Sequence, residues 1–162
     1  LLVAGGGHAM AAGLTIAPDQ LDALGDWLDA RLGATVTAAM ANQAVLVDLA
    51  LAPRGLAPSL IEAMETAGPF GMGWPGPRIA VGPVRLVKAD LVGTDHVRLI
   101  VRGEDGGSFK AIAFRAATTE MGQALLHRSR DRRLWLAGRA KIDDWSSRLQ
   151  AELHIEDAAW VD

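Results

Sequence analysis

Three consecutive glycines followed by a histidine, Gly5–His8, stand near the start of the chain. Glycine lets the backbone take positive φ and brings bare N–H groups close to a ligand. We expect a helix to begin in the small residues after His8, and N–H donors at a helix start beside an imidazole are typical of a phosphate site. A glycine-rich turn is also common as a plain turn, so the spacing alone leaves both interpretations open.

A metal centre is the second kind of chemistry to consider. Two-metal hydrolysis of phosphodiesters needs clustered carboxylates and imidazoles. The chain has no cysteine and only four histidines, which are scattered as His8, His96, His127 and His154. The sequence therefore predicts no metal ligands and no catalytic residues in this chain, and it predicts that His127 and His154 lie at the surface.

The formal charge of −3 is unevenly distributed along the chain. Residues 1–77 carry a net charge of −5, residues 78–141 carry +7 and residues 142–162 carry −5. A basic block between two acidic blocks is the asymmetry expected of a protein with a polyanion-binding face.

Within the basic block, Trp135, Arg139 and Lys141 share one face of an expected strand. An aromatic ring in line with two cations suits stacking against bases while phosphates are neutralised. Arg98 and Arg102, on an earlier strand, are candidates to extend that face. The alternative is an ordinary solvated strand face.

For two further basic or aromatic features, a purely structural role is an alternative to nucleic-acid binding. The run Arg128–Arg133 is usual for a solvated helix end and would add long-range attraction for a polyanion. Trp145 lies in an expected turn, where it would serve either as a structural plug or for base stacking.

The secondary-structure elements that position these residues begin with a layered α+β segment in the first 67 residues. The expected elements are a strand at 14–16, a helix at 18–32 with Trp27 beside its apolar stripe, a strand at 44–51 and a helix at 58–67. Residues 68–77 then hold three prolines and four glycines, which predicts a loop or connector.

The remaining residues have the pattern of a β domain. The expected strands are 79–90, 96–102, 108–114, 134–142 and 149–155, with a helix from Thr118 or Thr119 to about Arg130. Three strands, a helix and two more strands match a five-stranded OB barrel. The alternation alone also permits a small open sheet.

Two motifs carry a resemblance to a known family. The stretch from Gly6 to Ile16 closely resembles the GGH motif of the DHHA1 domain in DHH-family phosphoesterases. The stretch from Gly68 to Pro77 resembles the PFGxGNPxP motif of the RecJ exonuclease family, with Trp74 where that family has asparagine. The two motifs together, in this order, are more specific than either alone.

The resemblance implies an α+β chain, with residues 1–67 as the C-terminal part of a DHHA1 domain, residues 68–77 as a connector and residues 78–162 as an OB domain. It also implies that Gly5, Gly6, Gly7 and His8 grip a phosphate of the substrate. The nucleic-acid-binding candidates remain Arg98, Arg102, Trp135, Arg139 and Lys141.

The family activity implied is 5′→3′ hydrolysis of single-stranded DNA in repair and recombination, with Mn or Mg held by a separate DHH domain. The first residues look like the end of a strand, so we expect a piece of a longer protein that is inactive alone. Implied partners are single-stranded DNA, a single-strand-binding protein and a helicase. The absence of cysteine fits a reducing cytoplasm.

Two alternative functions remain open. The chain can be a non-catalytic module that binds single strands or docks a protein. It can also belong to another DHHA1-containing phosphodiesterase or to the C-terminal domain of alanyl-tRNA synthetase, although an OB barrel after the connector argues against both.

Overall fold

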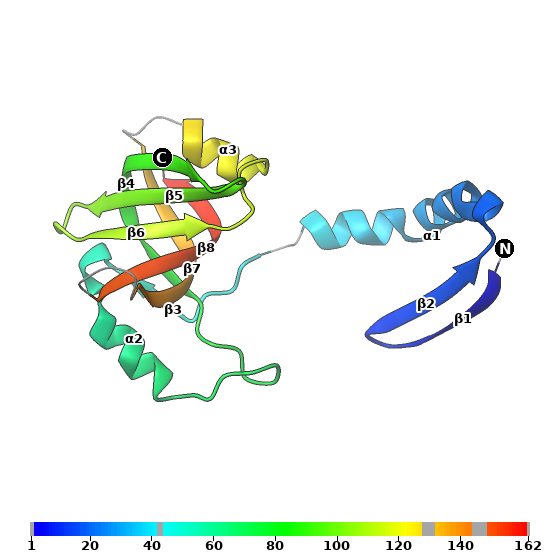
Figure 1. The fold of residues 1–162 in the computed structure, drawn as a ribbon, viewed down its shortest axis with the longest axis horizontal. Coiled ribbons are helices and arrows are strands. Elements are labelled where there is room, and N and C mark those ends of the chain that lie inside the picture. Colours follow the sequence, from blue (N-terminus) through cyan, green and yellow to red (C-terminus); the bar gives the residue numbers. More distant parts are fainter. Residues whose placement is uncertain (1, 42–43, 128–131, 144–148, 162) are drawn as a thin grey trace. The chain divides into compact units, whose positions relative to one another are not determined.

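The computed structural model describes residues 2–41, 44–127, 132–143 and 149–161. The chain divides into two compact units, residues 1–44 and residues 45–162 (Figure 1). No helix in the described part of the chain is both long enough and apolar enough to cross a membrane.

The first unit begins with a β-hairpin. Strand β1 (Leu2–His8) pairs antiparallel with β2 (Ala11–Ile16). The expectation of a helix directly after His8 is therefore wrong, because the ladder between the two strands holds the small residues extended. The glycine run is part of a strand and does not lie at a helix N-terminus.

A short 3-10 turn, η1 (Pro18–Gln20), then leads into helix α1 (Leu21–Ala41). The helix runs well past the expected end at Leu32, because an alanine-rich segment follows and Gly33, inside the helix, costs only about 1 kcal/mol relative to alanine. None of its residues is buried, and Trp27 is 51% exposed, contrary to the expected core packing.

The second unit is a closed barrel, as the sequence predicted. Its strands are β4 (Ile79–Val92), β5 (His96–Gly103), β6 (Ser108–Ala113), β7 (Arg133–Asp143) and β8 (Gln150–Val161). They neighbour one another in the order β4-β5-β6-β8-β7, and β4 pairs with β7 to close the ring. Only β6 and β8 run parallel among these neighbours. Helix α3 (Glu120–His127) joins the third and fourth barrel strands, which is the OB arrangement.

Alternation along the strands fills the barrel. On β5, Val97, Leu99 and Val101 are fully buried, whereas Arg98 and Arg102 between and after them are exposed. This alternation is the pattern of a strand with one face in the core and the other in solvent. Thr119 caps α3, since its Oγ1 accepts a hydrogen bond from Gly122 N at 3.1 Å.

Residues 45–67 pack on the barrel and do not form a separate layer. Strand β3 (Leu49–Leu51) joins β4 in parallel, and η2 (Pro53–Gly55) and α2 (Pro58–Glu65) follow. Leu56 and Ile61 are buried in the barrel core. The boundary between compact units therefore falls near residue 45, ahead of the connector at 68–77 that the sequence favoured as the domain boundary.

The β5–β6 hairpin is fastened to η2. Asp105 Oδ2 accepts a hydrogen bond from Arg54 N at 2.7 Å, and Asp105 Oδ1 accepts one from Gly107 N at 2.8 Å. The hydrogen bond from Arg54 N, followed by that from Gly107 N, holds the pKa of Asp105 below its ordinary value. A side chain at Gly107 would meet Arg54 N, so only glycine allows this contact.

Replacement of Ile61 by alanine tests whether α2 belongs to the barrel. Ile61 is 1% exposed, and its truncation is expected to lower the free energy of unfolding of the barrel by about 2–5 kcal/mol. Denaturant unfolding measures this. Glu62→Ala, on the exposed side of the same helix, is the control; equal stability of the two variants would contradict the packing of α2 on the barrel.

Replacement of Asp105 by asparagine tests the fastening of the hairpin. A carboxylate whose pKa is lowered by folding stabilises the protein above the unfolded pKa of about 3.9, and this stabilisation disappears as pH falls through the folded pKa. The variant is therefore expected to melt earlier than the parent near pH 7, with a difference that shrinks in strong acid. A difference that stays constant with pH would exclude this role of the charge.

Candidate nucleic-acid interface

The glycine–histidine segment lies exposed in the hairpin of the first unit. A Cβ at Gly7 would lie 2.6 Å from Ala11 O, so glycine is required there by the close approach of the two strands. A Cβ at Gly6 would meet nothing within 4 Å, which leaves its backbone open to approach. His8 Nδ1 accepts a hydrogen bond from Met10 N at 3.2 Å, so Nε2 is the ring nitrogen directed away from the turn.

The predicted β7 candidates do share the outer face of that strand, since the residues between them are buried. Trp135 packs against β4: a Cβ at Gly82 would lie 2.8 Å from Trp135 Cδ2. Part of the indole is thus occupied by the barrel wall, and its remaining surface is available to a ligand. Lys141 is exposed.

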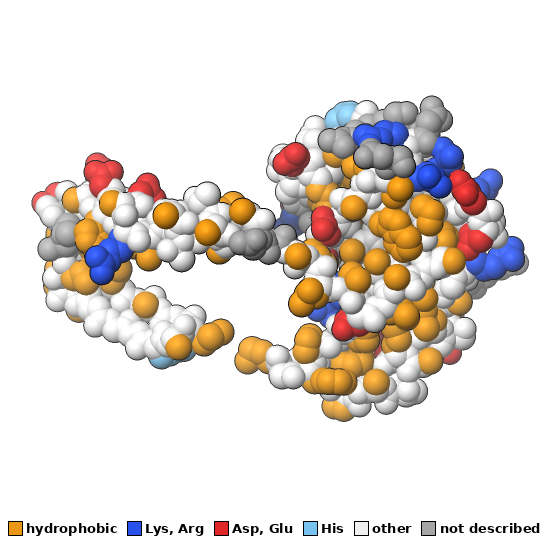
Figure 2. All heavy atoms as spheres, turned by 180° about the vertical axis from the view of Figure 1, so that it is seen from behind, with side chains coloured by type: hydrophobic (Ala, Val, Ile, Leu, Met, Phe, Trp, Pro, Cys, Tyr) orange, Lys and Arg blue, Asp and Glu red, His pale blue; other side chains and the backbone are white. Residues whose placement is uncertain are grey.

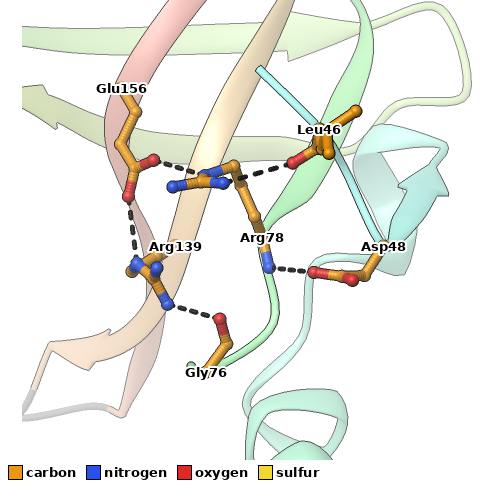
Figure 3. A network of polar contacts seen from close by, with 6 residues as sticks. All are labelled: Leu46, Asp48, Gly76, Arg78, Arg139 and Glu156. Carbon is orange, nitrogen blue, oxygen red and sulfur yellow. Dashed lines mark hydrogen bonds and ion pairs between the residues drawn. The ribbon is translucent and has the colours of Figure 1, made fainter. Parts of the chain in front are cut away.

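Arg139 participates in a polar network that anchors the connector (Figure 3). Its Nε lies 3.0 Å from Glu156 Oε1, and its Nη1 donates to the Gly76 carbonyl. Arg78 Nε lies 2.5 Å from the other Glu156 oxygen. Arg78 N also donates to Asp48 Oδ2 at 2.8 Å. Two guanidinium groups thus share one carboxylate, and Arg139 has a structural role whether or not it also contacts a ligand.

The other two predicted cations lie on β5, and β4 lies between β5 and β7. Arg102 lies opposite Arg85 on β4, which in turn lies opposite Arg133 on β7. Arg98 Nη2 lies 3.4 Å from Asp90 Oδ2. The hydrogen bond from Lys88, and more weakly that from Arg98, holds the pKa of Asp90 below its ordinary value.

An aromatic cluster that the sequence analysis missed lies on the outer surface of β5, β6 and β8. Phe114, which is 51% exposed, lies between two imidazoles in edge-on geometry. Its ring centroid is 5.2 Å from that of His96 and 5.0 Å from that of His154. We call these three residues the aromatic cluster. An exposed phenyl ring held at both sides is a ready surface for a planar ligand.

Of these three residues, the sequence predicts only His154 at the surface, and it does not indicate that the three rings meet. The parallel pairing of β6 with β8 brings them together, since Ile112 lies opposite His154. Arg98 in turn lies opposite Ile112, which brings a cation to the same row as the cluster. Such pairings between distant segments leave no local trace in a sequence.

Two groups of residues remain outside this description. Trp145 and residues 128–131 lie outside the described residues, so their predicted roles stay predictions.

Among the described residues, no group of three His, Cys, Asp or Glu side chains is placed to hold a metal ion.

Comparison with known proteins gives the family. The model of the RecJ OB domain family matches residues 47–157. The single-stranded-DNA-specific exonuclease RecJ of Dickeya dadantii is 31% identical over 165 residues, covering 96% of this chain and 26% of the relative. That of Bacillus subtilis is 28% identical over 156 residues, covering 95% of this chain and 19% of the relative. The chain thus spans about a quarter or less of the length of these curated relatives.

Among solved structures, RecJ of Thermus thermophilus in complex with Mn²⁺ is similar in fold. The TM-score is 0.59 at 21% identity, and the match covers all of this chain and 22% of that one. The topology of the barrel and the match over residues 47–157 agree, and on these two findings the chain belongs to the RecJ OB domain family.

Proposed function

We propose that the barrel binds single-stranded DNA and that the protein containing this chain is a 5′→3′ exonuclease specific for single strands. The relatives named above are single-stranded-DNA-specific exonucleases, which supports the substrate class. The observation that carries the proposal is the aromatic cluster on the outside of an OB barrel, with Arg98 beside it.

The position of the aromatic cluster supports base stacking. OB folds bind oligonucleotides on the face of their second and third strands and on neighbouring loops. These strands are β5 and β6 here, and His96 is the first residue of β5 after the turn that follows β4. Phe114 stacks a base, and the guanidinium of Arg98 neutralises a phosphate.

Trp135, Arg139 and Lys141 are a second set of proposed contacts, on β7. Their common outward direction supports this role. Arg139 keeps its bond to Glu156 when it does so, because that pair anchors the connector. Arg102 completes the proposed set on β5.

In the first unit, we assign to Gly5–His8 the grip on a substrate phosphate within a DHHA1 domain. The open surface at Gly6 and the free edge of the imidazole support this. Backbone and imidazole N–H groups stabilise charge on a phosphoryl oxygen without proton transfer. A hydrolytic metal, Mn or Mg, would be bound by a separate DHH domain, and we derive no step through it.

The proposed cellular location and process are inferred from the same resemblance to the family. We propose cytoplasmic DNA repair and recombination, with a single-strand-binding protein and a helicase as partners. These assignments depend on the resemblance of the two motifs and on the relatives' activity.

Replacement of Phe114 by alanine tests the stacking surface. Loss of base stacking is expected to weaken binding of labelled oligo-dT by about 1–3 kcal/mol. Fluorescence anisotropy with the 162-residue chain measures this. Trp74→Ala is the matched control, because Trp74 is 62% exposed on the connector; an equal or smaller loss in the Phe114 variant than in the control would argue against the cluster.

Replacement of His8 by alanine tests the phosphate grip in the full-length protein. Removal of one preorganised donor is expected to lower the rate of single-strand hydrolysis on the order of 100-fold. His127→Ala is the control, and circular dichroism checks that both variants are folded. Unchanged turnover in the His8 variant would remove its proposed role.

A further inference from the structure

The segment directly after β6 has a strained backbone. The ladder between β5 and β6 ends at the pair of Val97 and Ala113, so Phe114 and Arg115 lie beyond it. Arg115 has a φ of 52°, and in the described part of the chain it is the only residue other than glycine with a positive φ. This left-handed region is unfavourable for a residue with a Cβ, and it persists only where the surroundings fix it. Contacts outside the ladder therefore hold Phe114 in its position.

Two backbone hydrogen bonds fasten this segment to the turn between β4 and β5. Arg115 N donates to His96 Nδ1 at 3.0 Å, and Ala117 N donates to the carbonyl oxygen of Asp95 at 2.9 Å. An imidazole nitrogen accepts a hydrogen bond only while it carries no proton, whereas a carbonyl oxygen accepts in any case. The hydrogen bond of Arg115 N therefore depends on the protonation state of His96, and that of Ala117 N does not.

A carboxylate competes for the same imidazole nitrogen. His96 Nδ1 lies 2.8 Å from Asp95 Oδ1, which is within hydrogen-bond range. When Nδ1 accepts from Arg115 N, its lone pair faces this oxygen, which is unfavourable; a protonated Nδ1 donates to the oxygen instead. One atom thus has two partners that require opposite protonation states. Since histidine changes charge between about pH 5 and 8, the choice between the partners depends on pH.

The second imidazole of the aromatic cluster has no such conflict. His154 Nε2 lies 3.4 Å from Glu152 Oε1, and no backbone N–H in the described part of the chain donates to this ring. Val92, which lies opposite His96 on β4, is uncharged. The ionisable side chains around His96 besides Asp95 are Arg115 in the segment itself, His154 and Glu152 across the phenyl ring, and the ion pair of Arg98 with Asp90 on β5 and β4. The competition between an N–H donor and a carboxylate is thus specific to His96.

We propose that His96 is a positioning residue for base stacking and that its protonation releases Phe114 from the stacking position. The proposal rests on the proposed binding of single-stranded DNA at the aromatic cluster. With His96 neutral, the hydrogen bond from Arg115 N holds Phe114 beside the imidazole, with ring centroids 5.2 Å apart. When Nδ1 takes a proton from solvent, it donates to Asp95, Arg115 N loses its acceptor and the strained turn relaxes. Stacking on Phe114 then contributes less to binding.

The test measures the contribution of Phe114 to binding at about pH 8 and about pH 5.5. Fluorescence anisotropy with labelled oligo-dT gives the ratio of the dissociation constants of Phe114→Ala and the unmodified 162-residue chain. This ratio is expected to be about tenfold at the higher pH and about threefold or less at the lower pH. Lys and Arg side chains gather along one edge of the barrel unit (Figure 2), so DNA is attracted at any pH. Because both proteins carry these charges, the ratio removes the general effect of pH on the attraction.

Two asparagine variants assign the pH dependence to one imidazole. His96→Asn places an amide oxygen near the position of Nδ1, which keeps an acceptor for Arg115 N that does not titrate. In this variant the loss caused by Phe114→Ala is expected to be the same at both pH values. His154→Asn, on the other side of the phenyl ring, is the matched control and is expected to retain the pH dependence.

Amide hydrogen exchange followed by NMR tests the release without DNA. Protection of the Arg115 amide, relative to an unfolded chain at the same pH, is expected to fall about fivefold between the higher and the lower pH, as for the loss of one hydrogen bond. The Ala117 amide is the internal control, because its acceptor is the carbonyl oxygen of Asp95. Its protection is expected to stay constant.

Three outcomes would overturn the role of His96. They are equal protection of the Arg115 amide at both pH values, a Phe114→Ala loss that does not change with pH, and a pH dependence that persists in His96→Asn or disappears in His154→Asn. The proposed function fails in a different way: the unmodified chain would then bind oligo-dT at neither pH.

Discussion

The barrel depends on one strand, β4, that pairs with three others. Its first residues pair with β3 on one side and β7 on the other, and its remaining length pairs with β5. This requires a bend, and the β4–β7 register shifts between Val81 and Val84, where Gly82 and Pro83 interrupt the strand. Irregularities of this kind allow a sheet to curl and close. A side chain at Gly82 would collide with Trp135, so the bend and the packing of the indole require glycine at the same position.

Closure of the ring determines where a ligand can bind. The interior is filled by apolar side chains, and the described residues include no buried polar or charged side chain. The polar and charged side chains of the described barrel residues therefore lie on its outside, in rows defined by strand pairing. One row brings Arg98 to Ile112 and then to His154, beside Phe114. Another row brings Arg102 to Arg85 and then to Arg133.

The local sequence pattern was sufficient to predict most of the strands of the barrel and their order. The alternation of Val97, Leu99 and Val101 with arginines identified both the strand and its buried face, and the order of strands and helix indicated the OB topology. It was insufficient at the N-terminal hairpin, where glycine and alanine have no periodicity and pairing across the turn decides the conformation. It also missed the anchoring of residues 45–67, because the parallel pairing of β3 with β4 and the burial of Ile61 are contacts between distant segments.

The candidate site was predicted only in its parts. Facing could be deduced strand by strand, but grouping depends on which strands are neighbours, and only the structure shows that β4 lies between the strand of Arg102 and the strand of Arg139 and Lys141. The structure distinguishes these arginines by their surroundings. Arg78 and Arg139 share Glu156 and anchor the connector, so their charge is largely used within the fold. Arg98 lies 3.4 Å from Asp90, its side chain is 46% exposed, and its strand position is in the same row as the aromatic cluster. An arginine held at close range by a carboxylate and a backbone carbonyl stabilises the fold, whereas an exposed arginine beside an aromatic ring is placed to meet an external phosphate.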